Sequence, residues 1–293
     1  MNNQKSSRAD YLADLALRGV FRACLALPYT WRVPLMGWIM ARVVAPVAGY
    51  HKRIRENLAY VMPQMPEAEV RRMIRAVPDN FGRAMIETYS GDEFKAQLKN
   101  TALTGDGVAA LAQARQDNRP VLLVTGHFGN YDAPRAVLIA NGYTVGGLYR
   151  PASNAYFNRH YSAAISEIGL PLFTTERRDL PKMVRFIRDG GIQGIVLDMN
   201  SFGGAHLDFL GKPALTATAT AEMALKYDAL VLPIYGIRQP DGLSFEIRIE
   251  APIPHTDPET MTQALNDSLA ALVRQYPEQW LWIHRRWKLP RDN

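Results

Sequence analysis

The chain has 293 residues, of which 47% are hydrophobic and 21% charged, so it can bury a substantial core and is not a disordered protein. Its 34 lysines and arginines outnumber its 28 aspartates and glutamates, which gives a formal charge of +6. A single cysteine, Cys24, excludes both an intrachain disulfide framework and a cysteine-based zinc site. Residues 1–55 hold 9 basic and 2 acidic residues, so the positive excess lies at the amino-terminal end.

The amino-terminal segment is strongly apolar as well as basic. Residues 11–27 predict a helix, and a second apolar run covers residues 33–50. Charges within both runs argue against a clean membrane span and against a secretory signal. Composition alone leaves two interpretations open: a pair of buried helices, or an anchor in the membrane interface with its basic residues against anionic headgroups. The polar stripe of the first helix consists of Asp10, Asp14, Arg18 and Arg22.

We expect residues 1–50 to form a membrane-association segment and residues 51–293 an α/β domain. Helices are predicted at residues 67–85, 131–140, 155–168, 180–188, 217–226 and 258–276, and strands at residues 121–125, 143–149, 192–197, 230–237 and 244–249. The last two strands flank Pro240-Asp241-Gly242, which is typical of a hairpin. This alternation predicts an α/β fold with a mixed, mostly parallel sheet covered by helices.

The turn after the strand at residues 121–125 is the most informative stretch, with the sequence Gly126-His127-Phe128-Gly129-Asn130-Tyr131-Asp132. His127 and Asp132 do not share a helical face, so they meet only if His127 lies in the turn and Asp132 in the first turn of the next helix. Pro134, which is tolerated near a helix start, agrees with that placement. Asp132 would then hold one imidazole nitrogen while the other accepts a proton. The alternatives are a hydrogen-bonded turn histidine, a helix-start carboxylate and, for Asn130, a helix cap.

Other motifs are weak. The six histidines show no metal-ligand spacing, and the chain has no P-loop and no Gly-x-Ser-x-Gly elbow. We therefore expect no metal site. Near the end, tryptophans alternate with basic residues, which fits a nucleic-acid platform, an interfacial aromatic belt or simple domain closure. Residues 100–293 have 19 basic and 19 acidic residues, and this balance argues against nucleic acid.

The turn at residues 126–132 resembles the signature of the late acyltransferases of lipid A biosynthesis, which include the lauroyl and myristoyl transferases. They belong to the glycerolipid acyltransferase-like superfamily, marked by His, four residues, then Asp or Glu. Mycobacterial mannolipid acyltransferases share much of the pattern, and many lipid A members carry Glu where this chain has Asp132, so the acceptor and the acyl-chain length stay open. Further blocks follow in family order: Tyr149-Arg150-Pro151 with Asn154, Asp198-Met199-Asn200 with Gly203 and residues 209–214, and residues 277–288.

The resemblance implies transfer of a fatty acyl chain from acyl carrier protein, or less often coenzyme A, to a hydroxyl of a membrane glycolipid, foremost a lipid A precursor. It implies His127 as the general base and Asp132 as its partner, with no acyl-enzyme and no cofactor besides the carrier-bound donor. Asn130, Arg150 and Asp198 are the expected substrate-binding residues. Arg150 is a candidate to stabilise the oxyanion or to hold an acceptor phosphate, and Asp198 to support the pocket floor or to serve as a structural carboxylate.

The resemblance also favours the interfacial anchor for residues 1–50. It implies a peripheral or monotopic protein at the cytoplasmic face of the inner membrane. Its expected partners are acyl carrier protein, an anionic glycolipid acceptor and the membrane surface, with no nucleic acid. Three alternatives stay open: acylation of another glycolipid or a lysophospholipid, a non-catalytic lipid-binding protein that uses the same pocket, and a basic nucleic-acid binder.

Overall fold

The computed structural model describes residues 7–287. Residues 1–6 and 288–293, which are the start of the first predicted domain and the end of the second, lie outside the described residues. So does Lys288, the last residue of the block at residues 277–288, which we call the closing block. The main sheet of the structure has the strand order β1-β9-β8-β2-β5-β3-β4. β8, β2, β5, β3 and β4 run parallel, β9 is antiparallel to β8, and β1 is parallel to β9. The predicted mixed, mostly parallel sheet and its terminal hairpin are therefore confirmed. The strands are β1 (Leu103–Thr104), β2 (Val121–Thr125), β3 (Val145–Tyr149), β4 (Leu172–Thr174), β5 (Ile192–Val196), β8 (Leu230–Arg238) and β9 (Phe245–Ile249).

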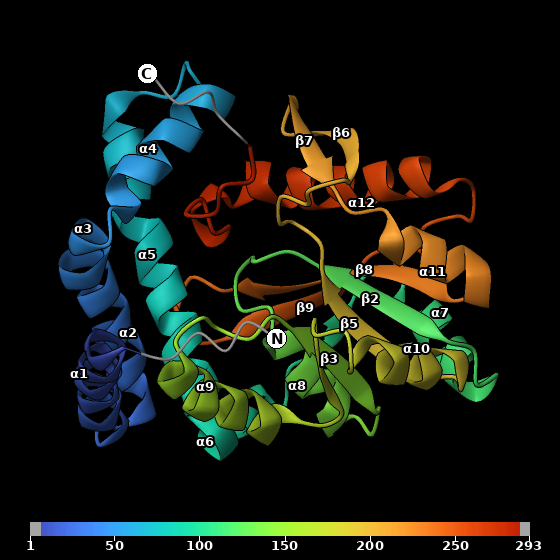
Figure 1. Cartoon of the computed structure of the whole chain (residues 1–293), viewed down its shortest axis with the longest axis horizontal. Helices are drawn as coiled ribbons and strands as arrows, with labels where there is room; N and C mark the ends of the chain where they lie inside the picture. The colour runs from blue at the N-terminus through green and yellow to red at the C-terminus, as the bar shows by residue number, and fades with distance from the viewer. Residues whose placement is uncertain (1–6, 288–293) are drawn as a thin grey trace.

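Helices cover both faces of this sheet (Figure 1). Side chains alternate along β2, so that Val121 and Leu123 pack with α6, α7 and α8, whereas Leu122 and Val124 pack with α10, α11 and α12. β2 is buried along its whole length because both of its faces are covered. The covering helices are α6 (Gly91–Leu98), α7 (Val108–Gln116), α8 (Ala133–Ala140), α10 (Leu180–Arg188), α11 (Ala219–Tyr227) and α12 (Pro258–Gln275).

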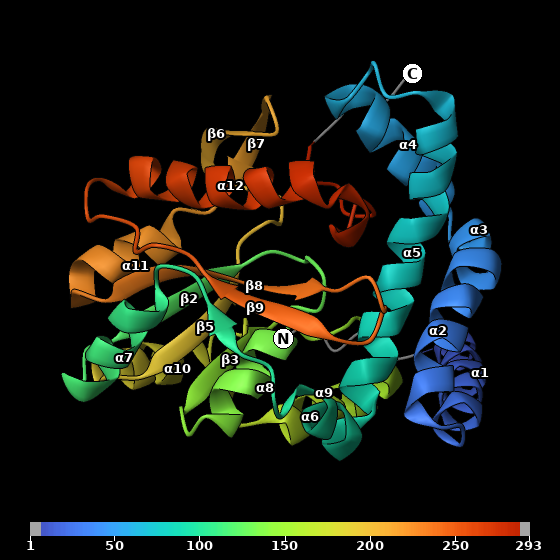
Figure 2. The same cartoon turned by 180° about the vertical axis from the view of Figure 1, so that it is seen from behind.

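The amino-terminal helices stack along the long helix α5 (Glu67–Tyr89), on the side of the molecule opposite α10 and α11 (Figures 1 and 2). Gly37 and Gly82 allow the close approach of α2 to α5, since a Cβ on Gly82 would lie 2.6 Å from the carbonyl oxygen of Met36. Within residues 7–287, no single helix is long and apolar enough to cross a membrane, although one pair bent by 87°, Tyr29–Val47 with Tyr50–Val61, meets the criteria of length and composition. These helices are α1 (Arg8–Leu25), α2 (Tyr29–Ile39), a π-helical turn (Met40–Val44), α3 (Ala45–Val47) and α4 (Tyr50–Val61).

The polar stripe of α1 turns partly toward the protein. Asp14 is 2% exposed, pairs with Arg18 as its spacing predicts, and also contacts His160 of α9 (Ala155–Ile168) at 2.8 Å. Because Arg18 balances its charge and His160 is within hydrogen-bond distance, the carboxylate is tolerated inside the protein. Apolar side chains of the same helix, Leu12 and Leu15, are exposed instead.

The carboxyl-terminal segment closes the domain. Trp280, Trp282 and Trp287 are buried and pack on each other, which supports domain closure over the two alternative interpretations of the tryptophan-rich stretch. Arg286 is fully buried and donates to Leu215 of a hairpin formed by β6 (Ala205–Phe209) and β7 (Lys212–Thr216). This hairpin was not predicted from the sequence, and neither were strands β1 and β4, which are too short to show an alternating pattern.

Candidate active site

The strand order brings two predicted site residues together. β2 and β5 are parallel neighbours, with Thr125 paired to Val196 at their carboxyl ends. His127 and Asp198 each lie two residues beyond that pair, so they emerge side by side at the edge where α/β proteins bind ligands. Nδ1 of His127 lies 2.8 Å from Oδ1 of Asp198.

The Asp198 carboxylate is fully engaged by protein donors. Oδ2 accepts the backbone N–H of His127 and the indole N–H of Trp280, both at 2.8 Å. Burial by itself would raise the pKa of Asp198, but the His127 imidazole and the hydrogen bonds from the side chain and backbone of His127 lower it below its usual value, so the group is ionised. An ionised carboxylate accepts the Nδ1–H of His127, so in the neutral imidazole Nε2 is the nitrogen that can accept a proton.

Asp132 occupies a different place from the one expected of an imidazole partner. It is the N-cap residue of α8, as its position after the turn suggests, and its carboxylate lies 3.6 Å from Nε of Arg135. Among the described residues, no hydrogen bond joins Asp132 to His127; the imidazole acts on it only through charge. Burial raises the pKa of Asp132 above its ordinary value of 3.8. The hydrogen-bonded carboxylate of His127 therefore comes from the segment after β5 rather than from the turn.

The raised pKa of Asp132 predicts how stability depends on pH. The folded protein holds this proton more tightly than the unfolded chain, so the wild type loses stability as pH rises from the ordinary value through the raised one. The melting temperature of Asp132→Asn minus that of the wild type should therefore increase as pH rises across this range. Asp198→Asn is the contrast: because the pKa of Asp198 is lowered, the melting temperature of this variant relative to wild type should fall as pH rises toward the ordinary value of 3.8, and should stay constant across the Asp132 range above it. Thermal unfolding at a series of pH values measures both, and parallel trends would contradict the prediction.

Buried polar contacts stabilise the turn at residues 126–132. Asn130 accepts the backbone N–H groups of Asp132 and Ala133 and donates to Glu87, so its amide is occupied. It bonds the chain that enters α8, although the N-cap position itself is Asp132. Glu87 is fully buried and also pairs with Arg238 of β8. Gly129 has φ +55°, and a Cβ there would overlap a backbone carbonyl of β8, so this position requires glycine.

A cavity of about 240 Å³ opens beside His127. Four residues of α5 line it, and their spacing of 3, 1 and 3 positions places them on the same side of the helix: Phe81, Ala84, Met85 and Thr88. Asn154 of the second block caps α9, the helix that brings Phe157 and Tyr161 to the cavity. The Tyr131–Tyr161 hydroxyl pair, 3.5 Å apart, also borders a second, largely apolar cavity of about 80 Å³. The cavity beside His127 is lined by Phe81, Ala84, Met85, Thr88, His127, Asn130, Tyr131, Phe157, Tyr161, Leu281 and His284.

The closing block supplies His284, a site residue to which the sequence analysis assigned no role. Its ring lies 4.4 Å from that of His127 in an edge-to-face arrangement. Burial, together with the nearby His127, lowers the pKa of His284 to about 4, so this imidazole is neutral near pH 7. A histidine in a carboxyl-terminal signature gave no local signal of this contact, since 157 positions separate it from His127.

Comparison with known proteins identifies the kind of enzyme that carries this site. The family model described as bacterial lipid A biosynthesis acyltransferase matches residues 2–289. The chain belongs to this family. It is an acyltransferase, and its family acts on lipid A or a related glycolipid.

The curated relatives are distant but cover most of the chain. It is 24% identical to the lipid A biosynthesis lauroyltransferase of Escherichia coli (strain K12), over 81% of this chain and 78% of the relative. It is also 24% identical to the phosphatidylinositol mannoside acyltransferase of Mycolicibacterium smegmatis, over 94% of this chain and 91% of the relative. The lipid A biosynthesis palmitoleoyltransferase of Escherichia coli (strain K12) is 23% identical over 92% and 89%.

The remaining predicted site residue of the acyltransferase, Arg150, does not line the His127 cavity. It follows β3, is exposed, and makes no hydrogen bond or ion pair with any residue that the structure describes. The same described region contains no cluster of three His, Cys, Asp or Glu side chains able to hold a metal ion.

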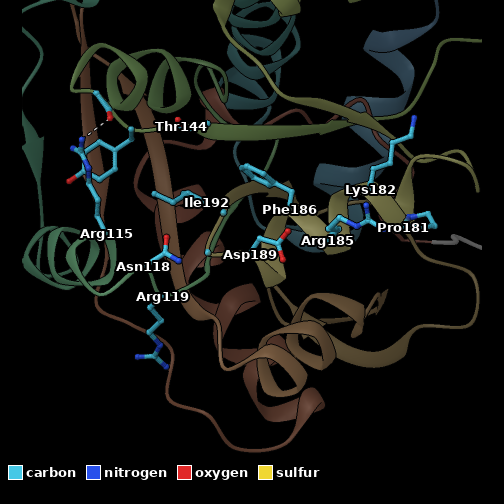
Figure 3. A pocket seen from close by; sticks show the side chains of 14 residues that line it. Arg115, Asn118, Arg119, Thr144, Pro181, Lys182, Arg185, Phe186, Asp189 and Ile192 are labelled. Carbon is cyan, nitrogen blue, oxygen red and sulfur yellow. Dashed lines mark hydrogen bonds between the residues drawn. The ribbon is translucent and has the colours of Figure 1, made fainter.

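A larger cavity of about 640 Å³ lies at the amino ends of the parallel strands, where β5 begins at Ile192 (Figure 3). His127 follows the carboxyl end of β2, so this cavity lies at the opposite end of the sheet from the acyltransferase site. It has a basic lining, but three of its cations are already held by the protein: Arg115 by the carbonyl of Gly142, Arg119 by Asp228 and Lys182 by Asp179.

Proposed function

We propose that this acyltransferase moves a fatty acyl chain from acyl carrier protein to a hydroxyl of a lipid A precursor, with His127 as the general base. One observation carries the proposal: Asp198 holds Nδ1 of His127, and the ring lines a cavity with mostly apolar walls. A cavity of that kind suits an acyl chain at the point where a proton must be removed.

The proposed reaction has two steps. The acceptor hydroxyl attacks the thioester carbonyl carbon while Nε2 of His127 takes its proton, and the carbonyl electrons move to oxygen to form a tetrahedral oxyanion. Collapse of the oxyanion reforms the carbonyl, breaks the carbon–sulfur bond and expels the carrier thiolate, which takes the proton from the His127 imidazolium. Asp198 orients the ring, and we assign to Asp132 a longer-range stabilisation of the imidazolium charge.

Direct transfer without an acyl-enzyme is part of the proposal. Of the described residues that line the cavity, none is serine or cysteine, and the hydroxyl of Thr88 donates to the carbonyl of Ala84. Cys24, the one thiol of the chain, is buried among the amino-terminal helices. A covalent route would need an activated nucleophile within hydrogen-bond reach of the base.

Mass spectrometry tests the reaction in cells and with purified protein. Lipid extracts from a deletion strain should lack one acyl chain, which the wild-type gene restores and a His127→Ala gene does not. Purified enzyme with a set of acyl–acyl carrier proteins and acyl–coenzyme A donors identifies the donor. Unchanged lipids in the deletion strain, together with lipid binding but no turnover, would instead support the non-catalytic lipid-binding alternative.

A second acceptor class is supported by the relative from Mycolicibacterium smegmatis, which is a phosphatidylinositol mannoside acyltransferase. It is as similar to this chain as the lauroyltransferase is. The same lipid extracts distinguish the two acceptors, because the missing acyl chain would then appear on a mannolipid. If the deletion strain instead lacked an acyl chain on a phospholipid and accumulated the lysophospholipid, both glycolipid acceptors would be wrong.

We also propose that the enzyme works at the cytoplasmic face of the inner membrane, with the α1–α3 side in the lipid interface. On α2, Trp31, Leu35 and Trp38 are exposed and lie three and four positions apart, so they form one outward stripe. Val33 and Met36 on the same helix are buried toward the body, so residues 1–50 also contribute to the fold. Aromatic side chains with neighbouring arginines are typical of interfacial helices.

Replacing two of these aromatics tests the membrane contact without removing core residues. Trp31→Glu/Trp38→Glu should weaken binding to anionic vesicles by about tenfold or more, since losing a buried apolar side chain costs at least about 1.5 kcal/mol. Both side chains are more than half exposed, so the variant should still fold. Leu225→Glu, on α11 at the far side of the molecule, is the control (Figure 1). Vesicle sedimentation measures the effect, and equal binding by both variants would contradict this placement.

A further inference from the structure

The proposed reaction requires hydrogen-bond donors for the oxyanion, and the backbone of the turn offers few. The N–H groups of residues 127, 128, 129, 130, 132 and 133 all donate to protein acceptors. Tyr131 supplies the one backbone N–H between residues 127 and 133 that lacks a partner among the described residues. Removing a single oxyanion donor in other enzymes costs about 100- to 1,000-fold in rate, so a side-chain donor is expected as well.

Few side chains at the cavity can take this role. Thr88 and Asn130 already direct hydrogen bonds into the protein, and Arg150 lies outside the cavity lining. The hydroxyls of Tyr131 and Tyr161 lie opposite each other at 3.5 Å, and one of them retains a free O–H. Among the described residues that line the cavity, the polar side chain that remains, apart from this tyrosine pair and His127 itself, is His284.

His284 has the feature expected of a donor that waits for a substrate. Its Nε2 is buried and has no hydrogen-bond partner among the described residues. Leaving a buried polar group without a partner is unfavourable, so such a group calls for an explanation, and a catalytic role is one. The ring is held in place through its backbone: Asn57 donates to the carbonyl of His284 at 3.0 Å, and the N–H of His284 donates to Leu281.

We infer that His284 is a further catalytic residue, whose Nε2–H donates to the thioester carbonyl oxygen as it becomes the oxyanion. This inference rests on the proposed acyl transfer with His127 as base. The edge-to-face contact of the two rings places the donor beside the base, on the cavity where the carbonyl carbon is attacked. The two imidazoles thus divide the work: His127 moves the proton and His284 stabilises the developing negative charge.

A neutral imidazole suits this role. The lowered pKa of His284 keeps it uncharged, so it does not repel the imidazolium that forms on His127 during the reaction. Neutral histidine acts as an electrophile in the same way in triosephosphate isomerase. A charged group at this position would interfere with protonation of His127 at 4.4 Å between ring centres.

A pair of substitutions of similar size tests the inference. His284→Met removes the donor and should lower kcat by about 100- to 1,000-fold with KM little changed. His284→Gln retains an N–H donor and should recover at least tenfold of that loss. Binding of a thioether analogue of the acyl donor, in which a methylene replaces the carbonyl, should not change in either variant, because no charge develops on it.

Several results would overturn the inference. These are wild-type kcat in His284→Met, equal rates in the Met and Gln variants, or a parallel loss of thioether binding, which indicates a general packing defect. The same fall in kcat in Tyr161→Phe, with His284→Met near wild type, would assign the oxyanion to the tyrosine pair. Failure of the proposed function itself looks different: His127→Ala would then keep its activity.

Discussion

His127→Ala is expected to lower kcat for acyl transfer by about 100- to 10,000-fold, since a positioned general base contributes that much to a proton-transfer step. Nε2 of His127 is left free at the cavity because Asp198 holds the opposite nitrogen. KM should change little, because the walls that hold the acyl chain come from α5 and α9. Steady-state kinetics with purified enzyme, acyl–acyl carrier protein and acceptor lipid measures both constants.

The control for this variant is His255→Ala. Its side chain is 28% exposed against 20% for His127, and it bonds a backbone carbonyl far from the cavity, so the two substitutions remove similar side chains. We expect the control to keep wild-type kcat. A His127→Ala enzyme with wild-type turnover would reject the general-base mechanism, and an equal loss in both variants would indicate a change in folding instead.

The second large effect is expected of Asp198→Asn, at about 10,000-fold in kcat. The Oδ2 position accepts two N–H groups, so the amide oxygen of asparagine should remain there and its NH₂ group should face Nδ1 of His127. Nδ1 would then have to accept, which moves the imidazole proton to Nε2 and abolishes the base. The corresponding aspartate-to-asparagine change in a serine protease has an effect of about that size for the same reason.

Asp132→Asn separates the two candidate partners of His127. It leaves the bond between His127 and Asp198 intact, so we expect a smaller loss of kcat than in Asp198→Asn. The kinetic comparison uses the same assay, with thermal unfolding to confirm that both variants fold. If Asp132→Asn were the slower enzyme and Asp198→Asn nearly normal, the assignment made from the spacing of the turn would hold instead.

Much of the fold follows from local sequence patterns. The strands at residues 121–125 and 230–237 were predicted from apolar runs between turn residues, and the structure has them as β2 and β8, buried on both faces. The hairpin of β8 and β9 followed from the turn residues between the strands. The β6–β7 hairpin was missed because exposed and half-buried side chains interrupt its strands, so no continuous apolar run marks them.

The candidate site was only partly accessible to the same patterns. The turn with His127 follows a strand directly, so its position at the carboxyl edge of the sheet was predictable. Its hydrogen-bonded carboxylate was not, because Asp198 becomes its neighbour only if β5 lies next to β2. Two further strands, β3 and β4, lie between β2 and β5 along the chain, and no local pattern specifies which of the three, β3, β4 or β5, pairs with β2.

The sequence by itself determined the α/β class, the family and the place of His127 at a strand end, because local spacing and motif order encode these properties. The tertiary structure decided what surrounds the histidine: Asp198 from the end of β5 onward, Trp280 and His284 from the carboxyl-terminal segment, and cavity walls from α5 and α9. It also turned Asp14 of α1 inward against His160 and left apolar side chains outside. The physical reason is the same throughout, since burial and hydrogen-bond partners depend on which distant segments pack together.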